Sequence, residues 1–491
     1  MFIRLPAGAM PKVALGRDRT EVAPALPIRI FNHYVHLPIV ILAIVEGLIF
    51  FGSVYGAAFL RFSNRYPGLW ENKAALFAQG VVFAFTMLGA LIAVGLYHAR
   101  QRAGTIGVVV RVVAGVALGL AGVTIIFYVF PTLYFGRGFF AYAAFLSILG
   151  ILLARIVFGN VVDEEVFKRR VLVFGAGKRA ESLTMLRRRT DQRGFKIIGF
   201  VRCEGDGDVV PDDRVVHLTI PMHEFAVAAS IDEVVIAMDD RRQNFPLHDL
   251  LECRVKGIDV LDLMNFLERE TGKVKLDVMN PSWIIFSDGF KRNGLREFVR
   301  RAFDLVASFG LLAIAWPLMI VAAIAIKIED GMGAPIFYRQ RRVGIDGEVF
   351  NLLKFRSMSV NAEADGKAQW AQKNDSRVTR IGALMRKTRI DELPQLLNVL
   401  RGDMSFVGPR PERPEFVSQL NERIPYYRER HCVKPGITGW AQLCYPYGSS
   451  EKDALEKLQY DLYYVKNHGF LFDLMILLQT AEVVLWGKGA R

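Results

Sequence analysis

The chain has 491 residues, of which 52% are hydrophobic and 23% are charged, and its mean hydropathy is +0.25. Its 62 Lys and Arg exceed its 49 Asp and Glu, which leaves a net charge of +13 with histidine neutral. This composition argues against a purely soluble enzyme, while the 11% aromatic content and the lack of a heptad period exclude a disordered chain and a coiled coil. The length predicts two or three folded units.

The cysteines and the N-terminal residues indicate a cytoplasmic chain end. Cys203, Cys253, Cys432 and Cys444 lie far apart without CxxC spacing, which favours neither a zinc site nor a disulfide framework and suits a reducing compartment. Residues 1–36 are basic and contain several prolines, and the apolar stretch after them is too long for a cleavable signal peptide. We expect a cytoplasmic tail that leads into a membrane anchor.

Four apolar stretches predict a membrane region over residues 37–162. They cover Leu37–Leu60, Ala74–Tyr97, Val112–Phe135 and Phe139–Val157. Each is close to the length of about 20 residues that a helix needs to cross the hydrocarbon core. Basic residues follow the second and the fourth stretch, so the positive-inside rule places both ends of the region in the cytoplasm.

Glu46 is an acidic residue inside the first of these stretches. An ionisable side chain within a span is a candidate functional group by default. The simpler alternative is a protonated glutamate, or one that faces the other helices. We favour this alternative because no second charge within the membrane is expected to partner Glu46.

Alternating strand and helix patterns predict a middle domain over residues 168–265. Strands are expected at Arg170–Phe174, Phe195–Val201 and Glu233–Met238. This alternation predicts a parallel, doubly wound sheet of Rossmann-like type. The glycine turn of Gly175–Ala180 could hold a diphosphate at the start of the next helix, with Glu204 as a ribose partner. The same glycines could instead serve only a tight turn, so both interpretations stay open.

Membrane-anchored nucleotide-sugar dehydratases and epimerases also join four spans to such a sheet. Their chemistry normally needs a Tyr-x-x-x-Lys pair, in which the lysine lowers the pKa of the tyrosine. No tyrosine of this chain has a lysine four residues later. Redox chemistry in the middle domain is therefore disfavoured, and a regulatory or structural role is preferred.

A fifth apolar segment, residues 302–326, follows a connector of turn-forming residues at 266–295. Pro317 lies in its middle, and proline removes a backbone donor and clashes with the preceding turn, so a bend is expected. Basic residues flank both ends, so the positive-inside rule favours neither orientation of a crossing helix. We expect a re-entrant helix, since an ordinary kinked span would place the chain after Lys327 outside the cell.

The last unit, residues 296–491, gathers basic residues on a predicted β-hairpin. The pattern from Pro335 to Arg356 predicts two strands that turn at Asp346-Gly347. Its arginines could contact lipid headgroups or phosphate ligands. Lys354 and Arg356 flank an aromatic residue that we expect to be buried, and they are the stronger candidates for phosphate binding.

Asp391 and Glu392 stand at the start of a predicted helix. Its apolar face consists of Leu393, Leu396, Leu397 and Leu400. Pro394 fits only a first turn, so the helix should begin near Asp391. Asp391 could be a simple N-cap whose neighbour complements the helix dipole. Alternatively, both carboxylates project toward a ligand, and Arg386 and Arg389 keep Asp391 ionised, as a nucleophile or a metal ligand requires.

Two turns rich in proline and glycine follow this helix. Arg410 lies between two prolines, and such a stiff backbone suits a fixed bidentate grip on phosphate. The alternative is a structural arginine that pairs with a neighbouring acid. The second turn is Lys434–Trp440.

Together these motifs resemble the catalytic domain of the monotopic phosphoglycosyl transferases. The resemblance covers residues 296–491 and rests on Lys354–Arg356, Asp391–Pro411, Lys434–Trp440 and Tyr460–Val465. With its spans and middle sheet, the chain is similar in architecture to their large subclass, the polyprenyl glycosylphosphotransferases that begin exopolysaccharide or O-antigen assembly. One departure is Trp316-Pro317, where smaller members often have Ser-Pro, so a serine hydrogen bond at the bend is lost.

The resemblance implies transfer of a sugar 1-phosphate from a UDP-sugar to undecaprenyl phosphate, with release of UMP. Asp391 would be the nucleophile of a phosphosugar-aspartyl intermediate, with Mg²⁺ bound at the same residue. Glu392 would support attack by the lipid phosphate. The phosphate-binding residues would be Lys354, Arg356, Arg386 and Arg410.

The expected protein is therefore a membrane protein of α plus α/β class. It would have a four-helix transmembrane bundle, a Rossmann-like domain and a C-terminal α/β-type catalytic domain. It would lie among lipids of the bacterial inner membrane, with its N-terminus and catalytic domain in the cytoplasm and no nucleic-acid partner. UDP-glucose is the donor expected from family frequency alone, and the basic membrane half could support a homodimer. The alternatives are a non-catalytic scaffold that senses nucleotide and an NAD-dependent dehydratase or epimerase.

Overall fold

The computed structural model describes residues 28–30, 33–35, 37–62, 73–97, 105–131, 137–161, 168–186, 194–207, 209–241, 245–279, 283–284, 290, 293–359, 377–446, 448 and 450–485. Most of the expected tail and part of the expected connector lie outside these residues. Within the tail, β1 (Ile28–Ile30) and β2 (His33–Val35) form a short antiparallel pair.

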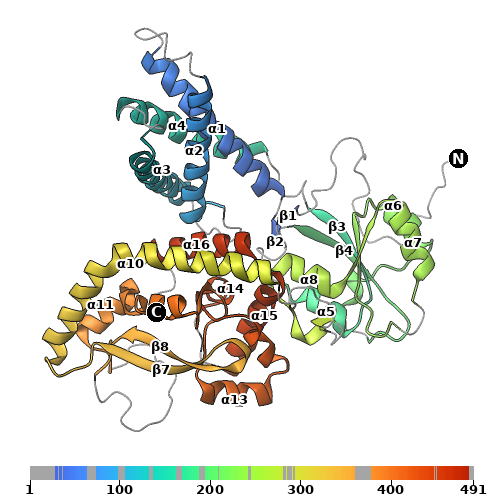
Figure 1. The fold of residues 1–491 in the computed structure, drawn as a ribbon. Helices are drawn as coiled ribbons and strands as arrows, with labels where there is room; N and C mark the ends of the chain where they lie inside the picture. The colour runs from blue at the N-terminus through green and yellow to red at the C-terminus, as the bar shows by residue number, and fades with distance from the viewer. Residues whose placement is uncertain are drawn as a thin grey trace.

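The four predicted apolar stretches form helices, shown in blue to teal in Figure 1. They are α1 (Leu37–Phe62), α2 (Lys73–Ala93), α3 (Thr105–Val129) and α4 (Arg137–Val161). α1 contacts α2 and α4, and α3 contacts the same two helices. Each of the four is long and apolar enough to cross a membrane, and so is a fifth helix, α10. The chain is thus a membrane protein with several apolar helices.

The predicted bounds of the second and third stretches were wrong. α3 begins seven residues before Val112 because the buried Arg111 can remain helical. Its Nη1 donates to the carbonyl oxygens of Val94 and Gly95, at 3.1 and 3.3 Å, just after α2. A charged side chain is tolerated at this depth where such acceptors meet it. α2 itself ends at Ala93, before a turn in which Gly95 has φ 80°.

Glu46 has a charged partner, contrary to the sequence-based expectation. Nε of Arg155 on α4 lies 2.6 Å from its Oε1, and Nη2 of the same arginine donates to Oε2 at 3.1 Å. Tyr97 donates to the same carboxylate. The prediction was wrong because Arg155 is a charged residue within the otherwise apolar fourth stretch, and the packing of α4 against α1 brings it to Glu46. The fully buried Glu46 therefore joins α1 to α4 and to the chain after α2.

The middle of the chain forms the expected parallel sheet, with strand order β4-β3-β5-β6. Its strands are β3 (Arg169–Phe174), β4 (Phe195–Val201), β5 (Glu233–Ile236) and β6 (Asp259–Asp262). Its helices are α5 (Lys178–Thr184), α6 (Met222–Ala228), α7 (Leu247–Val255) and α8 (Leu263–Thr271). Short 3₁₀ turns lie at Asp212–Arg214 and Leu276–Val278. The fourth strand, β6, was not predicted.

Successive side chains of each strand point to opposite faces of the sheet, and helices cover both faces. Val171 and Val173 of β3 face α5 and α8, whereas Leu172 faces α6 and α7. The core on the α5 and α8 face continues without a break into the C-terminal unit, where it includes Leu396 and Tyr463. The middle and C-terminal units therefore share one hydrophobic core.

Helix α10 (Gly294–Asp330) begins the C-terminal unit, contains Pro317 and bends along its length (Figure 1). Near its start, Arg301 donates to the carbonyl oxygens of Val399 and Leu400 at 2.5 and 2.6 Å. Near its end, Ala322 and Ile326 pack with Phe355 and Met385. Both ends of this 37-residue helix thus contact the same folded unit.

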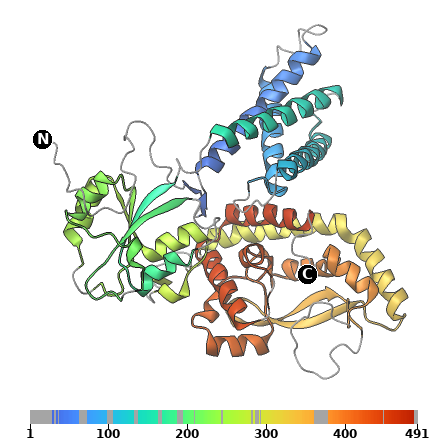
Figure 2. The same cartoon turned by 180° about the vertical axis from the view of Figure 1, so that it is seen from behind.

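The rest of this unit is α/β. The predicted hairpin is present as antiparallel β7 (Phe337–Val343) and β8 (Val349–Phe355), and Asp346 and Gly347 both have positive φ in its turn. The other elements are α11 (Arg380–Thr388), α12 (Gln395–Arg401), β9 (Ser405–Val407), α13 (Pro414–Arg423), β10 (Gly436–Thr438), α14 (Trp440–Cys444), α15 (Glu451–Asn467) and α16 (Phe470–Leu485). Figure 2 shows α16 beside α10, and α16 also contacts α2.

Candidate functional site

Asp391 and Glu392 lie in a 3₁₀ turn, Ile390–Glu392, between α11 and α12. The predicted helix start near Asp391 was wrong, because α12 begins at Gln395 after Pro394. The tight turn before it is closed by the N–H of Leu393, which donates to the carbonyl oxygen of Ile390 at 3.2 Å. No side chain caps either helical segment, so the interpretation of Asp391 as an N-cap is not supported.

Glu392 is the meeting point of three cations. Its Oε1 lies 3.1 Å from Nζ of Lys354, 3.4 Å from Nη2 of Arg410 and 3.7 Å from Nη1 of Arg389. Burial alone would raise the pKa of Glu392, but these cations outweigh burial and lower the pKa to about 2. Glu392 therefore stays ionised and holds its basic neighbours in place.

Asp391 is buried, with 7% of its surface exposed, and its Oδ1 has no hydrogen-bond partner among the described residues. Burial raises its pKa, and Lys354 is the strongest of the charges that oppose the rise. Arg386 and Arg389, which the sequence predicts to keep Asp391 ionised, oppose the rise in its pKa less than Lys354 does. A buried carboxylate oxygen without a partner is costly in a folded protein, and a bound water, ion or ligand group would satisfy it.

The remaining predicted residues come from β8, from α11 and from the segment after β9. Lys354 comes from β8, and burial lowers its pKa. Arg356 follows β8, and its buried Nε has no hydrogen-bond partner in the described part of the chain. Arg386 of α11 donates from Nε to Oγ of Ser357 at 2.9 Å. The structure thus joins Lys354 and Arg410 directly to Glu392. Pro317 lies inside α10.

Several residues behind Arg410 were missed by the sequence analysis. Gln442 accepts from Nη1 of Arg410 at 3.1 Å. The buried Arg430 donates from Nη2 to the carbonyl oxygen of Arg410 at 3.0 Å and pairs with the buried Asp461 at 2.8 Å. Asp461 lies inside the quoted motif Tyr460–Val465, which was the available signal, but no pattern marked Arg430 or Gln442.

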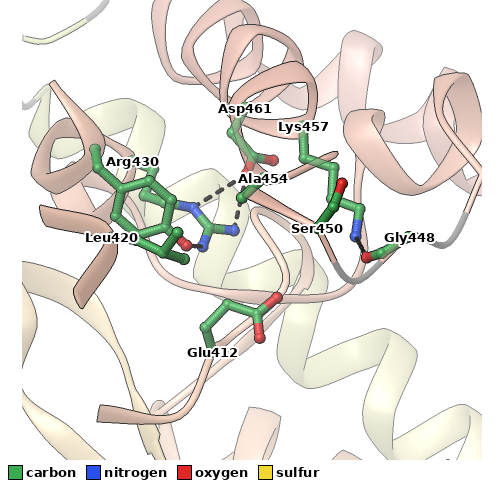
Figure 3. A pocket seen from close by; sticks show the side chains of 9 residues that line it. Glu412, Leu420, Arg430, Gly448, Ser450, Ala454, Lys457 and Asp461 are labelled. Carbon is green, nitrogen blue, oxygen red and sulfur yellow. Dashed lines mark hydrogen bonds and ion pairs between the residues drawn. The ribbon is translucent and has the colours of Figure 1, made fainter. Parts of the chain in front are cut away.

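A small cleft with a volume of about 20 Å³ lies beside Arg430 (Figure 3). Its polar lining includes Glu412, Lys457 and Asp461, and Nζ of Lys457 donates to the carbonyl oxygen of Gly448 at 2.7 Å. Figure 3 shows the guanidinium of Arg430 directed at Asp461, with Glu412 on the other side of the cleft.

The carboxylate of Asp391 could serve as a ligand of a magnesium ion that binds together with the substrate. Within the described ranges, no group of three or more His, Cys, Asp or Glu side chains could hold a metal ion. Mg²⁺ is commonly held by one or two carboxylates, with substrate phosphates and water completing its shell. The partnerless Oδ1 of Asp391 supplies such a carboxylate, whereas Oε1 of Glu392 is already engaged by cations.

Comparison with known proteins shows the family of this chain. The model of the bacterial sugar transferase family matches residues 295–487, and that of a CoA-binding domain matches residues 92–261. UDP-glucose:undecaprenyl-phosphate glucose-1-phosphate transferase of Escherichia coli (strain K12) is 34% identical over 320 residues, which cover 64% of this chain and 67% of that protein. The chain belongs to the polyprenyl glycosylphosphotransferases.

Two other relatives of this glycosylphosphotransferase differ in the sugar they are named for. The UDP-N-acetylgalactosamine-undecaprenyl-phosphate N-acetylgalactosaminephosphotransferase of Aeromonas hydrophila is 40% identical over 49% of this chain. The UDP-glucose:undecaprenyl-phosphate glucose-1-phosphate transferase of Xanthomonas campestris pv. campestris is 42% identical over 38% of it. The chain spans 56% and 38% of the lengths of these two relatives. Family membership favours a transferase over the scaffold and the dehydratase or epimerase.

Proposed function

We propose that this protein transfers a sugar 1-phosphate from a UDP-sugar to undecaprenyl phosphate and releases UMP, as the first step of exopolysaccharide or O-antigen assembly. The observation that carries the proposal is the partnerless carboxylate oxygen of Asp391, buried beside the cations around Glu392. A diphosphate is the kind of ligand that such cations attract, and a carboxylate is the kind of nucleophile that can attack it.

In the first step, a carboxylate oxygen of Asp391 attacks the β-phosphorus of the donor. The bond from this phosphorus to the bridging oxygen breaks, and UMP leaves with the bonding electrons. In the second step, an oxygen of undecaprenyl phosphate attacks the phosphosugar-aspartyl phosphorus and frees Asp391. The lipid phosphate is already an anion, so the second step needs no strong base.

Glu392 supports both steps by holding cations rather than by moving a proton. A carboxylate whose pKa is about 2 is a poor base near neutral pH. Its contacts instead fix Lys354 and Arg410 where they can bind the phosphates of the donor. Arg356 and Arg386 complete the proposed phosphate ligands, since the buried Nε of Arg356 is still in need of an acceptor.

We include Mg²⁺ in the proposal, bound at Asp391. When bound, the ion would offset negative charge on the diphosphate and so favour attack by an anion. Lys354 and Arg410 also attract the diphosphate, although each already pairs with Glu392.

The re-entrant arrangement of α10 rests on the contacts at its two ends. Arg301 near its start and Ile326 near its end both pack on the unit that carries Asp391. A helix of 37 residues would be about 55 Å long if straight, more than the hydrocarbon core requires. A crossing helix would separate these ends across the bilayer, whereas a helix bent at Pro317 keeps both on one side. We therefore place the catalytic unit on the cytoplasmic face of the inner membrane.

Cysteine labelling in right-side-out spheroplasts tests this topology. The starting variant has its four native cysteines replaced by serine. Met332, an exposed residue just after α10, is then replaced by cysteine. We expect an impermeant maleimide to label it only after the membrane is opened. Ser63→Cys, between α1 and α2, is the control and should react in closed spheroplasts. Reaction of Met332→Cys from outside would contradict the re-entrant arrangement.

A product assay with the full chain tests the activity. The shared core, and the 2.8 Å hydrogen bond from Nε1 of Trp440 to the carbonyl oxygen of Gly272, make the isolated C-terminal unit a poor substitute. The purified protein with undecaprenyl phosphate and Mg²⁺ should release UMP from a UDP-sugar. We take UDP-glucose as the first donor to test, followed by UDP-N-acetylgalactosamine and UDP-galactose. Release of UDP instead of UMP would show glycosyl transfer and overturn the proposal.

The pH dependence of the first step should report on Asp391, which must be ionised to attack. Its raised pKa moves the acidic limb of kcat/KM above that of an ordinary carboxyl. Lys354 opposes the rise, so Lys354→Met should move this limb about one pH unit higher, with the rate lost first at low pH. Lys387→Met, an exposed change on α11, is the matched control and should leave the limb in place. An unmoved limb in Lys354→Met would refute the assignment.

The proposed division of the chain keeps a tail at 1–36, a membrane region at 37–162, a middle domain at 168–265, a connector at 266–295 and the catalytic unit at 296–491. We also propose that the membrane half forms a homodimer. The molar mass of the purified protein in detergent, corrected for bound detergent, tests this.

A further inference from the structure

The glycine turn after β3 is where a doubly wound sheet would bind a nucleotide. The family model that matches residues 92–261 is that of a CoA-binding domain, and CoA carries an adenosine diphosphate. In that mode a diphosphate lies against backbone N–H groups of the turn and of the helix that follows. The partners of those N–H groups in this chain therefore decide whether such a ligand fits.

Asp239 already accepts hydrogen bonds from two of these groups. Its Oδ2 accepts from the N–H of Lys178 at 2.9 Å, and its Oδ1 accepts from the N–H of Arg179 at 2.8 Å. A Cβ atom on Gly177 would stand 2.1 Å from Oδ2 of Asp239, so the carboxylate lies directly against this glycine. Gly177 is needed here to admit the carboxylate of Asp239, which occupies the place of a ligand phosphate.

Asp206 accepts a hydrogen bond from a third N–H group of the turn and another from the backbone of Asp239. Its Oδ2 accepts from the N–H of Ala176 at 2.8 Å and from that of Cys203 at 3.3 Å. Its Oδ1 accepts from the N–H of Asp239 at 3.2 Å. The segments after β3, β4 and β5 are thus tied together at the carboxyl ends of the strands, the edge at which such sheets bind ligands.

We infer that the glycine turn does not hold a nucleotide diphosphate, because the carboxylates of Asp239 and Asp206 close its anion site from within. A diphosphate would have to displace both acceptors and would meet two like charges. CoA, NAD and UDP bound in this mode therefore do not fit the residues present, and Glu204 has no ribose to contact.

The end of α8, which lies in the proposed connector, contacts the C-terminal unit. Glu268 of α8 accepts from Nζ of Lys466 at 2.6 Å and from Nδ2 of Asn467 at 3.2 Å. Both donors lie at the end of α15, the helix that carries Asp461. Together with the contact of Trp440 at the carbonyl oxygen of Gly272, these bonds fix the two units to each other.

Hydrogen exchange and calorimetry with the full-length protein test the closed site. CoA, NAD⁺ and pyrophosphate at millimolar concentration should leave hydrogen exchange at the amides of Ala176 and Lys178 unchanged in the wild type, even where pyrophosphate binds at the proposed catalytic site. Saturable binding of any of them, with slowed hydrogen exchange at Ala176 and Lys178, would overturn the inference. These measurements need no variant and do not depend on the transferase activity.

Opening the site provides the second test. Asp239→Ala should speed hydrogen exchange at the amides of Lys178 and Arg179 and should tighten pyrophosphate binding roughly tenfold or more, because freed N–H groups attract anions. Asp240→Ala removes the same charge one residue along the chain and should do neither. If Asp239→Ala unfolds, Asp239→Asn keeps the shape and should give smaller changes of the same sign. Exchange and binding that match the wild type in both Asp239 variants would show that Asp239 does not close the site.

Discussion

Asp391→Asn should abolish sugar-phosphate transfer, with a loss of at least about a thousandfold in kcat, because an amide cannot replace the attacking carboxylate. The same change should abolish covalent labelling from a donor labelled in its sugar. The wild type without acceptor should release UMP to one equivalent and stop. The substitution keeps the shape of the side chain, and Oδ1 has no hydrogen bond to lose among the described residues, so the fold should persist.

Two variants separate a lost nucleophile from a general loss of negative charge. Asp346→Asn lies in the hairpin turn, where φ is 55° and asparagine is well tolerated, and it should retain full activity. Glu392→Gln should lower activity by loosening Lys354 and Arg410, yet it should still take up label. Label in Asp391→Asn, or transfer at near the wild-type rate, would move the nucleophile to another residue.

The parts of the fold that follow from local pattern were predictable. The apolar runs predicted α1 to α4, and Asp346-Gly347 predicted the hairpin turn because both residues accept positive φ. Details that depend on a distant partner were not predictable. Arg111 stays helical because carbonyl groups after α2 meet it, and Glu46 is paired because α4 brings Arg155 to it.

The same division holds for the candidate site. Asp391, Glu392, Lys354 and Arg410 were found from motifs in which several unusual residues stand at fixed spacing, and the structure brings them together. The helix start was misplaced because Pro394 marks the first turn only to within a few residues. Asp239 could not be found from the turn it closes, since it reaches α5 from the segment after β5.

Arg430→Met should destabilise the protein by about 3–5 kcal/mol, because it leaves the carboxylate of Asp461 buried and unpaired. It should also lower kcat/KM for the donor about tenfold. The reason is that the carbonyl oxygen of Arg410 loses its donor, and the backbone that aims the Arg410 guanidinium loosens. Thermal unfolding and initial rates at varied UDP-sugar measure the two effects.

The double variant Arg430→Met/Asp461→Leu separates positioning from stability. Replacing both members of a buried ion pair by apolar side chains is often neutral or stabilising, so the unfolding midpoint should return toward the wild type. The KM for the donor, which we expect to be raised in Arg430→Met, should also be raised in the double variant. The carbonyl oxygen of Arg410 lacks its partner in both variants. Arg423→Met breaks an exposed pair with Glu451, worth at most about 1 kcal/mol, and should change neither quantity. If the double variant recovered the wild-type KM together with its stability, Arg430 would act on folding alone, and the grip of Arg410 on the donor would depend on Gln442 and Glu392.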